Sequence, residues 1–156
     1  MKTRTILLTL ALYVLGAGVC LAQKSDALMG TWKLNEAKSK LAPDGQKNNT
    51  VVYEQAGDSI KVTIDGTDSS GKPTHTEWTG KLDGKDYPVT GDPNSDTRSY
   101  ERRTVHKTGF TAKKDKKVTI TGTIITSVDG KHRTVIATGT DAQGKKYKIS
   151  AVYDKQ

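Results

Sequence analysis

The segment Arg98 to Arg102 carries the side chains in this chain that are best suited to a specific chemical role. In a β-strand, Arg98, Tyr100 and Arg102 project from one face, because side chains alternate between the two faces. Turned inward, two guanidinium groups that flank a phenol form an anion site. Turned outward, they form a hydrated surface. We favour the outward or mixed orientation, because burying two unpaired arginines is costly.

A second candidate for a chemical role is the pair His75 and Glu77, which share one face of a predicted strand. The pair offers two metal ligands or an acid and a base, but no third ligand follows at a definable spacing. We interpret both as isolated surface residues. The chain also shows no Ser-His-Asp order, cysteine or histidine quartet, or glycine-rich phosphate loop. We therefore predict no catalytic residues, no metal, no cofactor and no enzymatic activity.

The elements that position these residues show an alternation of apolar and polar side chains. This period of two runs through residues 60–64, 117–128 and 147–153. Hairpin signals separate the runs, including Asp65-Gly66 and, most strongly, Asp129-Gly130, which suits the positive φ angles of a type I′ turn. The pattern predicts a meander of about nine antiparallel strands, with a loop at 83–96 and a helical turn or two near 35–43.

Long strands such as 117–128 favour an up-and-down barrel over a sandwich of short strands. Closure also removes the exposed strand edges that a meander otherwise carries. We therefore predict an all-β fold, a single antiparallel up-and-down β-barrel of about 8–10 strands.

Residues 1–22 read as a secretory signal peptide, with Lys2 and Arg4 before an apolar run at 6–19. This run is shorter than the ~20 residues that span a bilayer, so we expect no transmembrane segment. Cleavage between Ala22 and Gln23 removes Cys20, whose surroundings argue against lipidation. The prediction is an exported, periplasmic or secreted protein whose domain comprises residues 23–156.

The formal net charge of +8 comes from lysines and arginines spread along the chain. Lysines distributed evenly over a surface usually serve to keep a protein soluble. The alternative is weak contact with anionic envelope polymers. The basic run at 112–117 reads as a hairpin tip, and export argues against a nucleic-acid partner.

The chain also resembles a known family. Gly30 to Asn35, GTWKLN, is similar to the G-x-W start of lipocalins and to the GTWKL opening of fatty-acid-binding proteins. Together with AKSK, DGKDYPVTG at 83–91 and the ending AVYDKQ, it makes residues 30–156 resemble exported bacterial lipocalin-like (calycin-type) domain proteins. The resemblance implies a lipocalin- or fatty-acid-binding-protein-like barrel for a small hydrophobic ligand.

Gly30 and Trp32 would then be the structural plug of the barrel, with the indole over its floor. The Arg-x-Tyr clamp with which fatty-acid-binding proteins grip a carboxylate on the last strand lacks its arginine here, because Ala151 stands there. An acidic ligand would need another cation, and Arg98 and Arg102 are our candidates.

Two functions remain open at this point. The first is an exported small-molecule binding module for a hydrophobic or amphiphilic ligand, with a lining that includes Trp78, Arg98, Tyr100, Arg102, Tyr147 and Tyr153. The alternative is a non-catalytic structural or envelope-adhesion domain with a filled barrel and a basic surface. Strand number alone does not decide between them.

Overall fold

The computed structural model describes residues 26–42, 45–140 and 144–156, so the predicted signal peptide lies outside the described residues. Ten strands make up almost all of the regular structure: β1 Gly30–Leu34, β2 Lys47–Ala56, β3 Ser59–Thr67, β4 Pro73–Gly80, β5 Tyr87–Thr90, β6 Thr97–Thr104, β7 Lys107–Lys114, β8 Lys117–Thr126, β9 His132–Thr140 and β10 Lys146–Lys155. One 3₁₀ turn, η1 (Glu36–Lys38), follows β1. Within the described ranges, no helix has the length and apolarity to cross a membrane.

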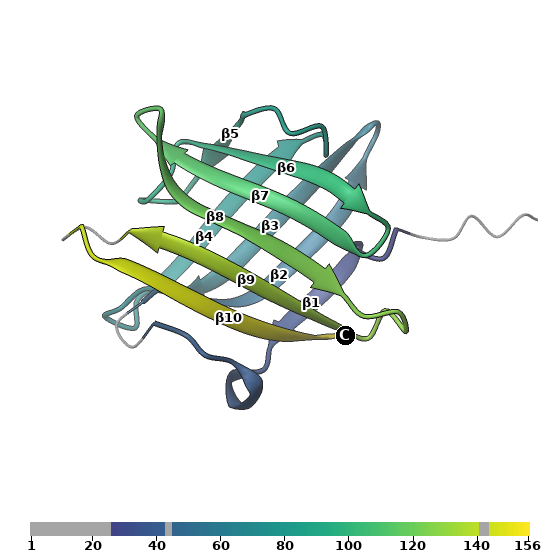
Figure 1. Cartoon of the computed structure of the whole chain (residues 1–156), viewed down its shortest axis with the longest axis horizontal. Helices are drawn as coiled ribbons and strands as arrows, with labels where there is room; N and C mark the ends of the chain where they lie inside the picture. Colours follow the sequence, from purple (N-terminus) through teal and green to yellow (C-terminus); the bar gives the residue numbers. More distant parts are fainter. Residues whose placement is uncertain (1–25, 43–44, 141–143) are drawn as a thin grey trace, which may run out of the picture.

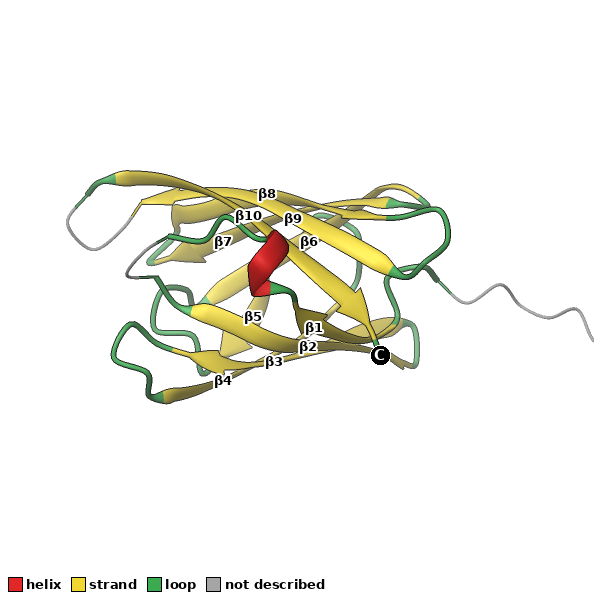
Figure 2. Cartoon of the chain, turned by 90° about the horizontal axis from the view of Figure 1, so that it is seen from below, coloured by secondary structure: helices red, strands yellow, loops and turns green. Residues whose placement is uncertain are grey.

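Each strand pairs antiparallel with its neighbour in sequence, and β10 pairs with β1 to close the barrel (Figure 1). The prediction of an all-β up-and-down barrel is confirmed. Seen along a perpendicular direction, β2–β4 and β8–β10 form opposite walls, with η1 outside β10 (Figure 2). We expected about nine strands and a loop at 83–96. The tenth strand is β5, which is four residues long and lies within that predicted loop. A run that short offers too few residues to show an alternation.

Two turns that we expected at Asp-Gly pairs differ in the structure. Asp115 and Lys116, between β7 and β8, are the two described non-glycine residues with positive φ, at 48° and 65°. Asp129 is not among them, so the type I′ prediction at Asp129-Gly130 is wrong. Its carboxylate instead accepts a hydrogen bond from the Lys131 amide at 3.0 Å and shapes a longer loop. Gly66 is also no turn residue, because it lies inside β3.

Alternation along each strand places one set of side chains in a buried core. Across the sheet, Val62, Trp78 and Val89 stand opposite one another in register, and all three are buried. Where the chain enters β1, the Trp32 indole N–H donates to the Leu28 carbonyl at 2.9 Å, and both side chains are almost fully buried. This contact fixes the segment before β1 against the end of the barrel.

Gly30 begins β1 with φ of +108°, a conformation that side-chain-bearing residues rarely adopt. A Cβ at this position would also lie 2.9 Å from Cε of Lys155 on β10. The glycine therefore permits both the entry of the chain and the close approach of β1 to β10.

Candidate functional site

The predicted anion face of β6 points into the barrel. We favoured an outward or mixed orientation, and the fully outward one is wrong, because Arg98 and Tyr100 are buried while Arg102 is only half-buried. The physical reason is a partner that strand parity does not reveal: Nη2 of Arg98 lies 2.7 Å from Oδ2 of Asp92, and their side chains are only 11% and 7% exposed.

Asp92 reaches Arg98 from the loop between β5 and β6. Its carboxylate accepts hydrogen bonds from Oγ of Ser95 at 2.5 Å and from the Asn94 amide at 2.9 Å, so the loop holds it in place. The charge of Arg98 is thus balanced inside the protein. Its Nε atom, however, is buried and has no hydrogen-bond partner.

Arg102 lies at the other end of β6 and has a carboxylate partner of its own. Its guanidinium forms an ion pair with Asp26 and donates from Nη1 to the Val105 carbonyl at 3.3 Å. Arg98 and Arg102 therefore share a face, as predicted, but separate contacts hold them at opposite ends of the strand. They do not converge on one ligand group.

Two predicted lining residues, Trp78 and Tyr100, meet in the interior. Their ring centroids are 4.7 Å apart in an edge-on arrangement, and the Trp78 indole N–H donates to the Arg98 carbonyl at 2.8 Å. Tyr87 and Phe110 extend this aromatic cluster, with centroids 5.8 Å from Trp78 and 6.0 Å from Tyr100 respectively. Such pairs add stability beyond their buried area.

Tyr147 lies apart from this cluster. Its ring covers Gly139 on β9, where a Cβ would lie 2.5 Å from the Tyr147 hydroxyl. Tyr153, the last predicted lining residue, is buried and belongs to a different group of side chains.

That group is centred on Arg133 of β9, which sequence reasoning missed. Its side chain is buried, and its Cζ lies 4.5 Å from the ring centroid of Tyr153, 5.0 Å from that of Tyr53 and 5.2 Å from that of Trp32. Nε and Nη1 of Arg133 are buried without a hydrogen-bond partner. A signal was present in the sequence, because Arg133 shares strand parity with Val135 and Ala137.

The buried phenols are kept neutral. Burial raises the pKa of Tyr53 well above its ordinary value of 10.0, and the nearby Arg133 offsets only part of the shift. Burial raises the pKa of Tyr153 in the same way.

The His75 and Glu77 pair lies on the outer face of β4. Nδ1 of His75 is 2.6 Å from Oδ1 of Asp65, and Oε1 of Glu77 is 2.5 Å from Nζ of Lys61. The hydrogen bond and charge of Lys61 lower the pKa of Glu77. Among the described residues, no group of three or more His, Cys, Asp or Glu side chains is arranged to hold a metal ion.

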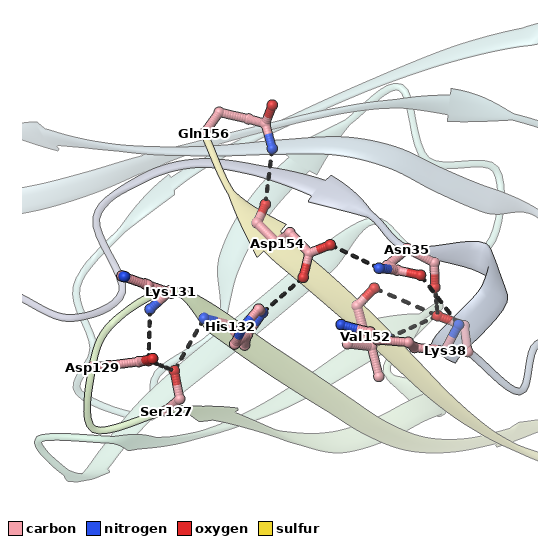
Figure 3. A network of polar contacts seen from close by, with 10 residues as sticks. Asn35, Lys38, Ser127, Asp129, Lys131, His132, Val152, Asp154 and Gln156 are labelled. Carbon is pink, nitrogen blue, oxygen red and sulfur yellow. Dashed lines mark hydrogen bonds and ion pairs between the residues drawn. The ribbon is translucent and has the colours of Figure 1, made fainter.

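Another exterior network fastens the last strand (Figure 3). The Asp154 carboxylate accepts from Nδ2 of Asn35 and pairs with Nδ1 of His132, both at 2.7 Å. The Asn35 hydrogen bond, and then that of His132, lowers the pKa of Asp154. The network joins β9, β10 and Asn35, the N-cap residue of η1, so its role is in barrel closure.

Two hollows are open to solvent, and neither is lined by Arg98, Tyr100 or Arg133. The first has a volume of about 420 Å³ and a charged lining of Asp86, Asp96, Thr97, Lys113, Asp115 and Lys116. The second has a volume of about 440 Å³ over β8–β10 and is lined by Val118, Thr119, Thr121, Thr138, Gly139, Thr140, Lys146, Tyr147 and Lys148.

No protein-family model and no curated protein matches this chain. Among solved structures, the chain is similar to EF1p2_mFAP2b bound to DFHBI, with 13% identity, a TM-score of 0.50 and coverage of 83% of this chain and 94% of that one. It is also similar to mFAP1, a redesigned β-barrel bound to DFHBI, with 16% identity, a TM-score of 0.46 and coverage of 83% and 95%. At 13% identity, the likeness to EF1p2_mFAP2b shows the fold alone, which in this chain is a closed ten-stranded antiparallel barrel.

Proposed function

We propose that this protein binds a small hydrophobic or amphiphilic molecule inside its barrel. The observation that carries the proposal is the set of buried N–H groups without acceptors, Nε of Arg98 and Nε and Nη1 of Arg133, beside buried aromatic rings. Buried donors almost always have partners, so unused ones call for an acceptor. Apolar walls with a few directed polar groups are typical of ligand sites.

The similar structure EF1p2_mFAP2b adds support, because that barrel is bound to the small molecule DFHBI. We further infer that this protein is an exported, lipocalin-like member of the barrel class, on the signal-like segment at 1–22 and the GTWKL opening. Intact-mass measurement of protein from the periplasm or culture medium should give a chain that begins at Gln23. A chain that retains residue 1 would contradict export with cleavage.

Binding is tested with Nile red, a neutral lipophilic dye whose fluorescence rises in apolar surroundings. The interior position Ala137 and its outward neighbour Thr138 provide a matched pair of variants. Ala137→Leu should weaken dye binding about ten-fold or more by occupying interior space, whereas Thr138→Leu should leave it within about two-fold. Absence of dye binding, together with no co-purified ligand in a native mass spectrum, would reject the proposal.

A second function, a structural or envelope-adhesion domain, is favoured by one observation. The side chains of Trp78, Tyr87, Tyr100 and Phe110 touch one another in the interior, as in a filled core. With a basic coat, such a domain would attach to anionic envelope polymers. Sedimentation with cell-envelope fractions that falls as salt rises would favour this function, and sedimentation independent of ionic strength would exclude it.

A further inference from the structure

We propose that the outer face of β8–β10 binds an acidic polysaccharide, in the hollow of about 440 Å³ over these strands. The site lies outside the barrel, so the inference goes beyond the interior ligand. It rests on the second function, envelope adhesion, and adds the surface and the class of polymer. The carrying observation is a lining that combines lysines with threonine hydroxyls and includes no acidic side chain.

Strand register places these hydroxyl and amino groups on one surface. Thr121 of β8 stands opposite Thr138 of β9, and Thr138 stands opposite Lys148 of β10. In the next row, Thr140 stands opposite Lys146. All five residues are exposed, whereas the residue between the two threonines of β9 is buried, so the two rows face solvent. The three strands lie side by side as one wall of the barrel (Figure 1).

The positive charge of this wall is not cancelled by acidic neighbours on its strands. β8, β9 and β10 carry one acidic residue, Asp154, at the far end of β10, where its carboxylate accepts from Asn35. Asp115, in the turn before β8, lines the other hollow together with two further aspartates. An anion is therefore attracted to the hollow that contains Lys146 and Lys148, and less to the acidic one.

The lining matches the surface of a sugar. Each threonine hydroxyl can donate and accept a hydrogen bond, and each lysine offers three donors. The hydroxyl oxygens of Thr121 and Thr138 are 3.3 Å apart, so both can reach one sugar oxygen. Val118, which also lines the hollow, is 55% exposed and would contact the C–H face of a sugar ring together with the threonine methyl groups.

The arrangement of the lysines favours a polymer over a single anion. Lys146 and Lys148 are two residues apart on β10, which corresponds to about 7 Å along a strand. This spacing suits successive charged groups of one chain. Exposed ion pairs are individually weak, so useful affinity requires many repeats that bind together. A polysaccharide with a carboxylate on its sugar units supplies the charge, the hydroxyl groups and the repeats.

The first test compares three polymers by isothermal titration calorimetry at about 0.15 M salt. Polygalacturonate has carboxylates and sugar rings, dextran has sugar rings without charge, and polyphosphate has charge without sugar. We expect polygalacturonate to bind about ten-fold or more tightly than dextran, and more tightly than polyphosphate at equal charge. In NMR spectra, trigalacturonate should shift the backbone amide signals of residues 118–121, 138–140 and 146–148.

The lysines are tested with variants of equal net charge. Lys146→Gln/Lys148→Gln should weaken polygalacturonate binding about ten-fold or more. The matched variant Lys72→Gln/Lys85→Gln removes the same charge from exposed residues in other loops, and should keep the affinity within about two-fold. An equal loss in both variants would show attraction to the overall charge and would overturn the site.

The hydroxyl groups are tested without any change of charge. Thr121→Val/Thr138→Val retains the side-chain shape and should weaken polygalacturonate binding about five-fold, while polyphosphate binding stays the same. The matched variant Thr79→Val/Thr90→Val, at exposed positions on β4 and β5, should bind as the wild-type protein does. Equal binding of polygalacturonate and polyphosphate, unaffected by Thr121→Val/Thr138→Val, would overturn the assignment to a polysaccharide.

Two further outcomes separate this inference from the proposed functions. Polygalacturonate that displaces Nile red would place the polymer in the barrel mouth and overturn the external site. Salt-sensitive sedimentation with envelope fractions, together with no binding of polygalacturonate, would leave envelope adhesion standing and also overturn this inference. Nile red binding by itself decides only the interior ligand.

Discussion

Two buried arginines in one small barrel are held by different means. Arg98 has a carboxylate at 2.7 Å, whereas Arg133 is surrounded by aromatic rings. Guanidinium suits both settings, because it is planar, weakly hydrated and able to stack on rings. Nε and Nη1 of Arg133 have no hydrogen-bond partner beside these rings. A site that holds a cation in this way is suited to receive an acceptor.

At the residue scale, Trp32 supplies one of the ring faces and is one of the two largest fully buried side chains, with Trp78. Trp32→Ala should lower the free energy of unfolding by about 3–5 kcal/mol, the usual cost of deleting a large buried aromatic group. Urea denaturation would measure the change, with Val105→Ala as a control at a position that is 65% exposed. An unchanged melting temperature in Trp32→Ala would contradict the prediction that Trp32 is the structural plug.

The buried phenols predict a pH dependence. Because folding raises the pKa of Tyr53 above its ordinary value of 10.0, the unfolded chain releases a proton that the folded chain retains once the pH exceeds that value. The free energy of unfolding should therefore be independent of this group below about pH 10 and should fall as the pH rises further. Tyr153 contributes with the same sign.

Absorbance at 295 nm, which reports tyrosinate, would follow this ionisation. The signals of Tyr53 and Tyr153 should appear only together with the loss of far-ultraviolet circular dichroism. Tyr53→Phe should remove one of the late-ionising phenols and reduce the loss of stability at high pH. Ionisation of every tyrosine in the folded protein near pH 10 would contradict the prediction.

Sequence reasoning predicted the shared face of Arg98, Tyr100 and Arg102, because strand parity is a local property. It did not predict which way the face points, because orientation depends on the ion pair with Asp92, delivered by a loop outside β6. It missed Arg133, although this residue shares strand parity with Val135 and Ala137, because a single charged residue at an inward position does not by itself indicate a buried side chain. Only the closed sheet brings it against Trp32 and Tyr53.

At the element scale, the strands were predictable and the turns less so. Alternation identified long strands such as β8, whereas β5 is too short to show it. The Asp-Gly signal at 129–130 marks a real connection, but side-chain hydrogen bonds of Ser127 and Asp129 lengthen it beyond a two-residue turn. The two-residue turn with positive φ is instead Asp115-Lys116, where the sequence carries no glycine.

This turn predicts a stabilising substitution. Lys116 has φ of 65°, a conformation that costs a side-chain-bearing residue roughly 1 kcal/mol and glycine much less. Lys116→Gly should therefore raise the free energy of unfolding by up to about 1 kcal/mol. The control Lys117→Gly, at the start of β8, should not stabilise the protein. Destabilisation by Lys116→Gly, measured in urea, would contradict the positive φ at this position.

At the scale of the whole molecule, stability depends on how the last strand meets the first. β1 pairs with β10 over a short register that includes Trp32 opposite Lys155 and Lys33 opposite Asp154. The barrel class was predictable because strand length and turn spacing limit the alternatives. The closing register was not, because it depends on the conformation of Gly30 and on the exterior contacts of Asp154.

Removal of residues 154–156 should therefore open the seam. The truncation deletes the pairing partners of Trp32 and Lys33, the hydrogen bond from Asn35, and the bond from the Gln156 amide to the Thr31 carbonyl at 3.0 Å. β1 then presents unpaired backbone groups, and such an edge recruits strands from other molecules. Size-exclusion chromatography with light scattering should show concentration-dependent oligomers of the truncated protein, whereas removal of Gln156 alone should leave most of the seam paired. A truncated protein that stays monomeric and melts at the wild-type temperature would show that the β1–β10 seam contributes little, and that the remaining sheet holds Trp32 and Arg133 in place without it.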